Sequence, residues 1–245
     1  MNRILLAIII VVFSLFVLIQ SSCKKEDPIT TTGSTTGNYP PGYVHCDPSN
    51  PTAVVDVTNP TTGKIWMDRN LGASQVATSS TDANSYGDLY QWGRFADGHQ
   101  CRTSVTTTSL SSSDQPVHGN FIIDMSNPWD WRSPQNNNLW QGVNGVNNPC
   151  PTGYRLPTEA ELNAERQSWG SNNAAGAFAS PLKLPLAGLR SLSSGSLYLV
   201  GSYGYCWSST VSSTNSRYLA FSSTDAYMLS SYRAYGLSVR CLKDY

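Results

Sequence analysis

Apolar and polar positions divide the chain into three stretches. An apolar run covers Ile4 to Ile19 and is broken only by Ser14, whereas residues 28–41 form a Thr/Gly/Ser tract with almost no apolar side chain. From about residue 42, short apolar runs alternate with clusters of Gly, Ser, Asn and Pro, which indicates strands joined by turns. One strand-rich domain is therefore expected after a leader and a polar linker.

The first half of this domain shows one clear pair of strands. Residues 53–57 and 64–67 predict two strands around an Asn59–Gly63 turn. Residues 82–92 predict a short helix, although an internal glycine opposes it. Residues 104–148 have little periodicity, and so long an irregular segment in a compact domain is usually functional or pinned by a disulfide.

The second half contains the clearest helix. Pro157 ends a strand, Thr158 is the expected N-cap, and Glu161 completes a capping box for a helix that runs to about Trp169. Short segments then alternate with turns, which predicts a strand-rich meander and an α+β fold. These segments are 182–189, 197–202, 205–209, 217–221, 227–229 and 236–242.

The amino-acid composition limits the kinds of partner that the protein is expected to bind. Charged residues make up 13% of the chain, the formal net charge is zero, and soluble domains usually contain about 25%. No basic stripe is present to meet a phosphate backbone, so nucleic acid is not an expected partner. The abundance of Tyr, Trp, Ser, Thr, Asn and Gly suits exposed β-structure with polar loops, as in extracellular binding domains.

The N-terminal run indicates export. It follows Arg3 and is shorter than the ~20 residues of a spanning helix, so residues 1–22 are expected to be a signal peptide. Cys23 then resembles the lipidated cysteine of a bacterial lipobox and would attach the protein to a membrane. Gln20 departs from that pattern because an aliphatic residue is usual there. An uncleaved N-terminal anchor is therefore the alternative.

The lipidated cysteine would be followed by a linker and one domain. Residues 23–41 are expected to be a flexible tether, and residues 42–245 the globular domain. Lys24–Asp27 is similar to the signal that sends Bacteroidota lipoproteins to the outer face of the outer membrane. The alternative is that these charges merely solvate the chain.

Five ordered motifs between about residues 53 and 244 resemble one family. They are Ile65–Ala73, Tyr86–Arg94, Cys150-Pro-x-Gly-Tyr-Arg-Leu-Pro-Thr158, Trp207–Thr210 and Tyr232–Asp244. They are similar to the motifs of the FISUMP family, the major paralogous domain named after Fibrobacter succinogenes. The resemblance implies a surface domain with a fold like that of C-type lectins and formylglycine-generating enzymes. It assigns no activity.

The resemblance also implies a disulfide framework. The family's closing motif implies that Cys150 pairs with Cys241, which leaves Cys46 and Cys101 as the expected second pair in an exported protein. Cys206 stands where the family more often has an aromatic residue, and we expect a buried, unpaired thiol there.

The cysteine and histidine residues give little support for a metal site or for redox chemistry. His45-Cys46 and His99-Gln-Cys101 form a two-histidine, two-cysteine set suited to zinc, but an oxidising compartment favours the disulfide. Formylglycine-generating enzymes hold copper with two nearby thiolates, whereas only Cys206 is expected to be unpaired here. No metal and no cofactor are therefore expected.

The motifs of calcium-dependent lectins are missing. Glu-Pro-Asn and Gln-Pro-Asp do not occur, Gln115-Pro116 precedes the Cys150 helix, and Trp207-Ser-Ser replaces Trp-Asn-Asp. A loop over residues 128–140 is rich in tryptophan and amide groups, the chemistry of carbohydrate recognition. The alternative, favoured for at least two of its three tryptophans, is that they fold inward. The candidate ligand-binding residues are Trp129, Asp130, Trp131, Asn136, Asn137, Asn138 and Trp140.

These features predict a lipoprotein of the bacterial outer membrane, exposed at the cell surface. The expected role is non-catalytic recognition or adhesion toward polysaccharide or an envelope protein. The alternatives are an enzyme on a formylglycine-generating-type scaffold and a purely structural envelope protein. No catalytic residue is expected, since the Gly-x-Ser-x-Gly and His-Glu-x-x-His motifs do not occur.

Overall fold

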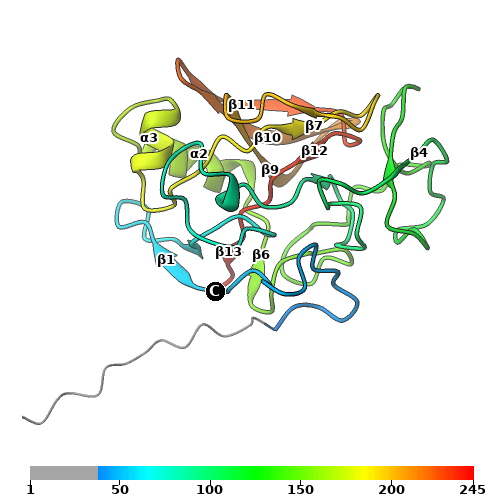
Figure 1. Cartoon of the computed structure of the whole chain (residues 1–245), viewed down its shortest axis with the longest axis horizontal. Helices are drawn as coiled ribbons and strands as arrows, with labels where there is room; N and C mark the ends of the chain where they lie inside the picture. Colours follow the sequence, from blue (N-terminus) through cyan, green and yellow to red (C-terminus); the bar gives the residue numbers. More distant parts are fainter. Residues whose placement is uncertain (1–37) are drawn as a thin grey trace, which may run out of the picture. The chain divides into compact units, whose positions relative to one another are not determined.

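A computed structural model describes residues 38–245. The expected signal peptide, the lipidated Cys23 and the tether as far as residue 37 lie outside the described residues. The described chain is rich in strands and has two α-helices, which is an α+β fold (Figure 1). Neither helix is long and apolar enough to cross a bilayer. The helices are α2 (Glu159–Gln167) and α3 (Ala174–Ala179), and the longest strands are β9 (Tyr203–Ser212), β10 (Asn215–Ser222) and β11 (Ala226–Ser231).

One sheet joins the beginning of the domain to its end. The predicted early pair forms an antiparallel hairpin of β1 (Asp56–Thr58) and β2 (Ile65–Met67). In this sheet β13 (Leu242–Lys243) lies between β2 and β6 (Tyr154–Arg155). The last strand therefore closes the domain from inside a sheet, where both of its edges are paired.

Two disulfides fasten this arrangement, and both have the expected pairing. Cys150 is bonded to Cys241 immediately before β13, with Cα atoms 5.9 Å apart. Cys46 is bonded to Cys101 across a Cα distance of 5.4 Å. Cys206 is buried and has no disulfide partner. The first disulfide links the segment before the main helix to the final sheet strand, and the second anchors the start of the domain.

Helix α2 begins as its capping residues predict. The Thr158 side chain accepts from the Glu161 amide, and the Glu161 carboxylate accepts from the Thr158 amide, so the capping box is complete. The inner side of the helix buries Leu162 and Glu165, and the Glu165 carboxylate accepts a 2.5 Å hydrogen bond from Asn59. This contact attaches α2 to the first hairpin turn.

The helix predicted over residues 82–92 is wrong. Only Ala83–Ser85 is helical, as one 3₁₀ turn capped by the Asp82 side chain. Gly87 then adopts a left-handed φ of 68°, which a continuing α-helix does not allow. The chain instead turns into strand β3 (Tyr90–Gln91). Helix α3, by contrast, was not predicted.

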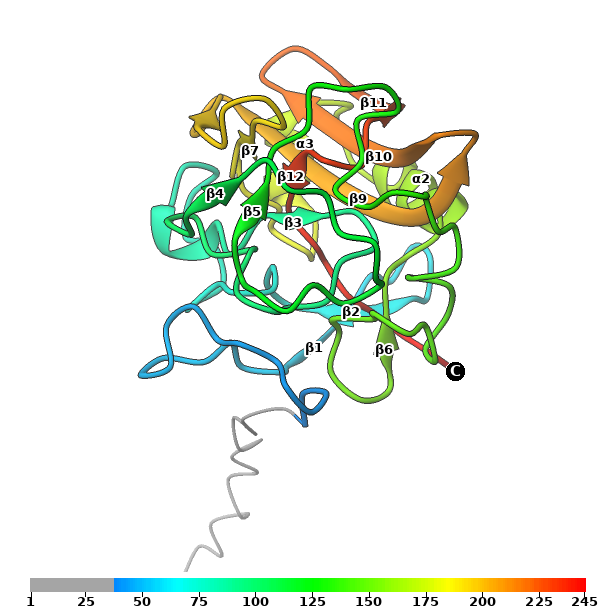
Figure 2. The same ribbon diagram turned by 90° about the vertical axis from the view of Figure 1, so that its right-hand side faces the viewer.

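A second four-stranded sheet, the three-stranded sheet β11-β10-β9 and a long irregular segment make up the rest of the fold. Strands β3, β12 (Gly236–Leu237), β7 (Leu189–Arg190) and β8 (Leu197–Tyr198) form one sheet, in the spatial order β3-β12-β7-β8. The segment 104–148 is largely irregular, as expected. Its only regular part is the parallel pair β4 (Thr106–Thr107) and β5 (Phe121–Ile122), which lie side by side in Figure 2.

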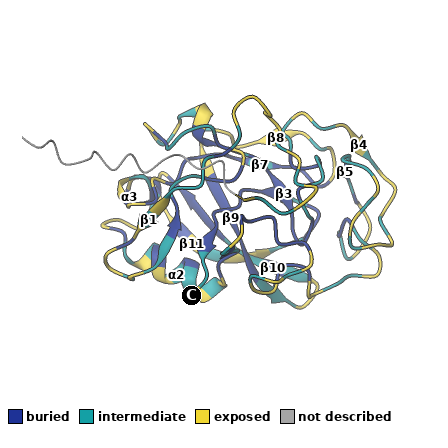
Figure 3. Cartoon of the chain, turned by 90° about the horizontal axis from the view of Figure 1, so that it is seen from below, coloured by how far each residue is buried: buried dark blue, intermediate teal, exposed yellow. Residues whose placement is uncertain are grey.

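Indole groups tie this irregular segment to the core. The indole N–H of Trp131 donates to the Trp92 carbonyl at 2.7 Å, and that of Trp92 donates to the Ser208 carbonyl at 2.8 Å. Trp207 donates in the same way to the Tyr90 carbonyl at 2.8 Å. Buried residues run through the centre of the domain, and exposed ones lie on the loops and helix edges (Figure 3). Buried indoles thus donate hydrogen bonds to backbone carbonyls of other segments.

The domain begins earlier than the predicted boundary at residue 42. The Tyr39 hydroxyl donates to the Thr52 carbonyl at 2.9 Å, and its ring lies 4.4 Å from that of Tyr43. The Asn38 carbonyl accepts a 2.9 Å hydrogen bond from the Thr152 amide. Residues 38–41 therefore belong to the folded domain and not to the tether.

Candidate functional site

The sheet β11-β10-β9 has two unlike faces. Side chains of a strand alternate between the faces, and one face carries Cys206, Leu219 and Phe221 in a buried cluster with α2 and α3 residues. There Trp169, just after α2, lies edge-on to Phe221 with ring centroids 5.8 Å apart. The opposite face carries most of the tyrosines of these strands and is only partly covered.

A groove crosses this second face. The strand register places Ala220 of β10 between Tyr205 of β9 and Tyr227 of β11. Neighbouring strands lie about 4.8 Å apart, so a methyl group between two phenol rings leaves a depression. The depression has a volume of about 220 Å³. We call it the tyrosine groove. Its lining residues are Tyr203, Tyr205, Tyr218, Ala220, Phe221, Ser222, Thr224, Asp225, Tyr227 and Leu229.

Aromatic rings form the walls of the groove. Tyr203 and Tyr205 stack with centroids 5.9 Å apart and an interplanar angle of 7°, and Tyr218 continues the row 6.1 Å from Tyr205. Tyr203 is 38% exposed and Tyr227 is 52% exposed. These two rings therefore present solvent-accessible faces, while the inner tyrosines hold the walls in place.

Short polar side chains close one end of the groove. The Ser222 amide donates to the Asp225 carbonyl at 2.8 Å, which shapes the turn between β10 and β11. The Ser222 and Thr224 hydroxyls lie 3.1 Å apart. Hydroxyl and carboxylate groups thus stand at the rim, within reach of a molecule that rests on the rings.

The phenols of the groove are hydrogen-bond donors at neutral pH. Burial raises the pKa of Tyr205 to about 12, and burial also raises the pKa of Tyr218. A hydrogen bond with Asp225, together with its negative charge, raises the pKa of Tyr227. The groove contains one carboxylate and no histidine. It suits stacking and hydrogen bonding, and it offers neither a histidine nor a second carboxyl group for acid–base catalysis.

Exposed apolar side chains gather in two segments at this part of the fold. Half of the strongly exposed large apolar residues of the described chain lie in 197–203 and 227–229. The first segment leads directly into β9, and the Tyr203 amide donates to the Leu199 carbonyl at 3.0 Å. Concentrated exposed apolar surface is typical of an interaction site.

The structure corrects part of the predicted ligand surface. Trp131 and Trp140 are fully buried, so at least two of the three loop tryptophans fold inward, as the alternative held. Asp130 is also buried, and its carboxylate lies 3.8 Å from the Arg233 guanidinium. Burial raises the pKa of Asp130 to about 6. These three side chains support the loop from inside and offer no face to a ligand.

The other predicted residues lie at the surface but are engaged within the protein. Trp129 is partly buried and packs on Tyr232, with ring centroids 4.4 Å apart. Asn136 donates to the Asp114 carboxylate at 2.9 Å, and the Asn137 side chain accepts from Arg233 at 2.7 Å. Asn138 is exposed, and its amide donates to the Asn136 side chain. These contacts engage the amide side chains of the loop within the protein, and they leave Trp129 only partly exposed.

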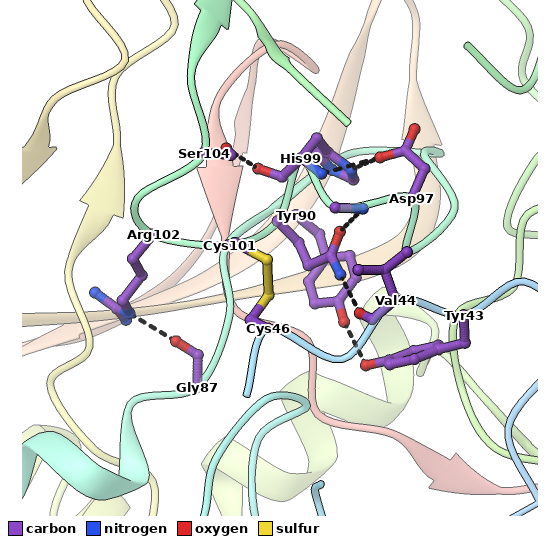
Figure 4. The surroundings of a disulfide bond; sticks show 12 residues. Tyr43, Val44, Cys46, Gly87, Tyr90, Asp97, His99, Cys101, Arg102 and Ser104 are labelled. Carbon is purple, nitrogen blue, oxygen red and sulfur yellow. Dashed lines mark hydrogen bonds and ion pairs between the residues drawn. A yellow bond between two sulfur atoms is a disulfide. The ribbon is translucent and has the colours of Figure 1, made fainter. Parts of the chain in front are cut away.

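The cysteine and histidine pairs do not form a zinc set. Cys46 and Cys101 are bonded to each other, and the His99 ring lies 2.7 Å from an Asp97 carboxylate oxygen on the far side of the disulfide (Figure 4). Cys206 is buried, and burial raises the pKa of its thiol to about 11. Because the other described cysteines are in disulfides, no pair of thiolates stands ready for copper in residues 38–245.

A larger hollow elsewhere offers less chemistry. It measures about 540 Å³ and lies between Pro40-Pro41 and residues 143–154. Tyr154 is its one ionisable side chain that does not form a disulfide, and the Tyr154 hydroxyl is bonded to Asp56. We therefore regard the tyrosine groove as the better candidate.

The groove was not predicted, although its sequence signal is present. Tyr203, Tyr205 and Trp207 recur at every second position, as do Tyr218 and Ala220. That period places them on one strand face. The strands were predicted, but which face the helices cover cannot be seen in the period alone.

Comparison of the chain with protein-family models, with characterised proteins and with solved structures gives no significant match. The resemblance to the FISUMP family therefore stays a prediction from the sequence motifs.

Proposed function

We propose that this protein is a non-catalytic binding protein of the bacterial cell surface and that the tyrosine groove takes a sugar unit of a polysaccharide. The observation that carries the proposal is the pairing of exposed rings with a polar rim. Tyr203 and Tyr227 offer flat apolar faces, and Thr224 and Asp225 stand at the end of the groove. The C–H faces of a sugar stack on such rings, while its hydroxyls bond to the rim.

The composition of the groove favours binding over catalysis. Glycoside hydrolysis generally uses two carboxyl groups on either side of the scissile bond, and Asp225 is the single carboxylate that lines the groove. Its phenols hold their protons at neutral pH. An enzyme on a formylglycine-generating-type scaffold is not favoured, because the one free thiol of the described residues is buried.

A polysaccharide fits the groove better than a folded envelope protein does. The depression has a volume of about 220 Å³, which suits one sugar ring. A polysaccharide repeats its sugar units, so each unit offers the groove the same stacking contact. A stable protein interface usually buries about 800 Å² on each partner around a buried apolar centre. The groove is small and has a polar end, so we assign it to a glycan chain.

We further propose the C-type-lectin-like arrangement and membrane attachment through Cys23. Support for the arrangement is the sheet in which β13 lies between β2 and β6, closed by the Cys150–Cys241 disulfide. Support for export is the presence of two disulfides, which persist in oxidising compartments. Labelling with a radioactive fatty acid tests the lipid, and protease treatment of intact cells tests surface exposure.

A glycan array with the purified chain tests the function. We expect binding to at least one polysaccharide class and a loss of tenfold or more in Tyr227→Ala. Tyr245→Ala is the matched control, because Tyr245 is 77% exposed and lies outside the groove. Equal binding by the wild type and Tyr227→Ala would overturn the proposal, as would capture of a protein partner through the same face with no glycan bound.

A further inference from the structure

A second hollow lies beside the Cys46–Cys101 disulfide and shares no lining residue with the tyrosine groove. Its volume is about 280 Å³. Arg102 lies on one side of the disulfide, with its guanidinium directed toward Gly87, as Figure 4 shows. We call this hollow the Asp88 pocket, after the residue that distinguishes it.

Asp88 is buried without a partner. The residue lines the pocket and is 5% exposed, and its carboxylate oxygen Oδ2 has no hydrogen-bond partner among the described residues. No described basic side chain lies within 4 Å of it as an ion pair. A buried carboxyl group with nothing bonded to it is costly. Asp88 is therefore a buried polar residue of this pocket whose side chain lacks a partner within the protein.

Two glycines hold the carboxyl group in place. A Cβ atom on Gly72 would lie 2.1 Å from the Asp88 Cγ atom, and one on Gly87 would lie 2.2 Å from the Leu71 carbonyl oxygen. Both glycines have left-handed φ angles, 79° and 68°. Any other residue at position 72 would push the carboxyl group away. The backbone is thus built to admit this side chain.

Arg102 does not neutralise the carboxyl group. Its Nε donates to the Gly87 carbonyl at 2.6 Å and its Nη2 to the Ala187 carbonyl at 3.0 Å, while the guanidinium lies 5.5 Å from the Tyr86 ring centre. These contacts use two of its five N–H donors, and neither is made to Asp88. The pocket also contains Asp47, whose hydrogen bonds with Ser49 lower its pKa. The buried atom of the pocket without a hydrogen-bond partner is therefore an acceptor, the Asp88 Oδ2.

We propose that the Asp88 pocket binds the primary ammonium group of a small organic amine. An ammonium group supplies three donors and one positive charge, which matches one buried carboxyl group beside a second carboxylate. The pocket volume admits a monosaccharide or an amino-acid side chain, so the amine belongs either to an amino sugar or to a lysine-like aliphatic chain. Charge-assisted hydrogen bonds of this kind are the strong ones.

Binding couples to a proton. Burial raises the pKa of Asp88 to about 8, although the charge of Arg102 lowers it, so the empty pocket holds a neutral carboxyl group at pH 7. An ammonium ligand stabilises the carboxylate, and one proton leaves to solvent for each amine bound. The titratable and charged groups around Asp88 are Tyr39, Tyr43, His45, Asp47, Tyr90 and Arg102.

Calorimetry with the purified full chain tests the proposal. The probes are glucosamine against N-acetylglucosamine, and Nα-acetyl-lysine amide against its Nε-acetylated form. We expect one of the free amines to bind at least tenfold more tightly than its acetylated partner. Titration in two buffers with different ionisation heats should show the release of about one proton at pH 7. The arm that responds identifies the source of the amine.

Two variants distinguish a loss of amine binding from a failure to fold. Asp88→Asn should weaken amine binding at least tenfold, and Thr103→Trp, at an exposed position on the pocket rim, should block it with Asp88 intact. Asp225→Asn in the tyrosine groove is the control and should leave amine binding unchanged, so failure of the groove and failure of the pocket are separable. Three results would each overturn the proposal. They are equal binding of the free and acetylated probes, no binding of either amine at 10 mM, and Asp88-dependent binding of calcium ions in place of the amine.

Discussion

Tyr203 and Tyr205 stack their rings with centroids 5.9 Å apart and planes inclined by 7°. They are two residues apart on β9, so both side chains stand on the same sheet face. The buried ring of Tyr205 holds the exposed ring of Tyr203 in one orientation. A ring that is already ordered loses little side-chain entropy when a sugar rests on it.

Tyr203→Ala should therefore weaken polysaccharide binding about tenfold, whereas Tyr203→Phe should weaken it about threefold or less. Stacking needs the ring, whereas the solvent-exposed hydroxyl adds at most one hydrogen bond, worth about 0.5 kcal/mol or roughly twofold in affinity. Affinity electrophoresis in gels containing the bound polysaccharide measures both values. Equal losses in the two variants would show that the hydroxyl and not the ring makes the contact.

Trp131 should be important for stability and unimportant for binding. Trp131→Phe removes the donor to the Trp92 carbonyl and leaves that buried oxygen unsatisfied, which costs about 1–3 kcal/mol. Urea denaturation followed by circular dichroism should show a free energy of unfolding lowered by that amount. Glycan binding by the folded variant should match that of the wild type. A loss of glycan binding without a loss of stability would show that the loop takes part in ligand binding.

Gly204 should resist substitution by alanine. A Cβ atom there would lie 2.0 Å from the Phe221 ring on the buried side of the sheet, and overpacking of this kind costs about 1–3 kcal/mol. Gly170→Ala is the matched control, since nothing lies within 4 Å of its Cβ position. Thermal unfolding should show a lower melting temperature for Gly204→Ala only. Similar melting temperatures in the two variants would contradict the packing of β9 on β10.

The Cys150–Cys241 disulfide should contribute strongly to stability because it closes 91 residues. Replacing both cysteines with alanine should lower the free energy of unfolding by about 2–5 kcal/mol, chiefly because the unfolded chain regains its freedom. Denaturation of the oxidised wild type and the double variant measures the difference. An unchanged stability would mean that the bond does not form in the protein as purified.

Asp88 should make stability fall as the pH rises. Its pKa is raised in the folded state, from an ordinary 3.8 to about 8. Between these values the folded protein binds more protons than the unfolded chain, so the free energy of unfolding decreases from about pH 4 to about pH 8. Relative to the wild type, Asp88→Asn should be stabilised at about pH 9 by roughly 2 kcal/mol or more and by little at about pH 4.

Denaturation curves at several pH values test this prediction. The difference in stability between Asp88→Asn and the wild type should grow across the interval and level off above about pH 8. A constant difference for Asp88→Asn would show that this carboxyl group is ionised throughout and in contact with water.

Local sequence features were sufficient to predict several parts of the fold. Thr158 and Glu161 lie three residues apart, and their capping box forms wherever a helix begins there, so α2 was predictable. The first hairpin follows from two apolar runs around a Pro- and Gly-containing turn. In both cases the stabilising contacts join residues close in sequence. The pairing of Cys150 with Cys241 came from resemblance and not from local chemistry.

Tertiary packing decided the sites. Whether a tryptophan faces solvent depends on distant partners, and Trp131 is buried because the Trp92 carbonyl, 39 residues away, accepts its N–H. The strand period placed Tyr205 and Trp207 on one face, but only α2 and α3 determine which face is covered. Asp88 could not be distinguished from a surface carboxylate, because the glycine that admits it lies sixteen residues earlier. Burial is a property of long-range contacts, and the order of residues records those contacts only indirectly.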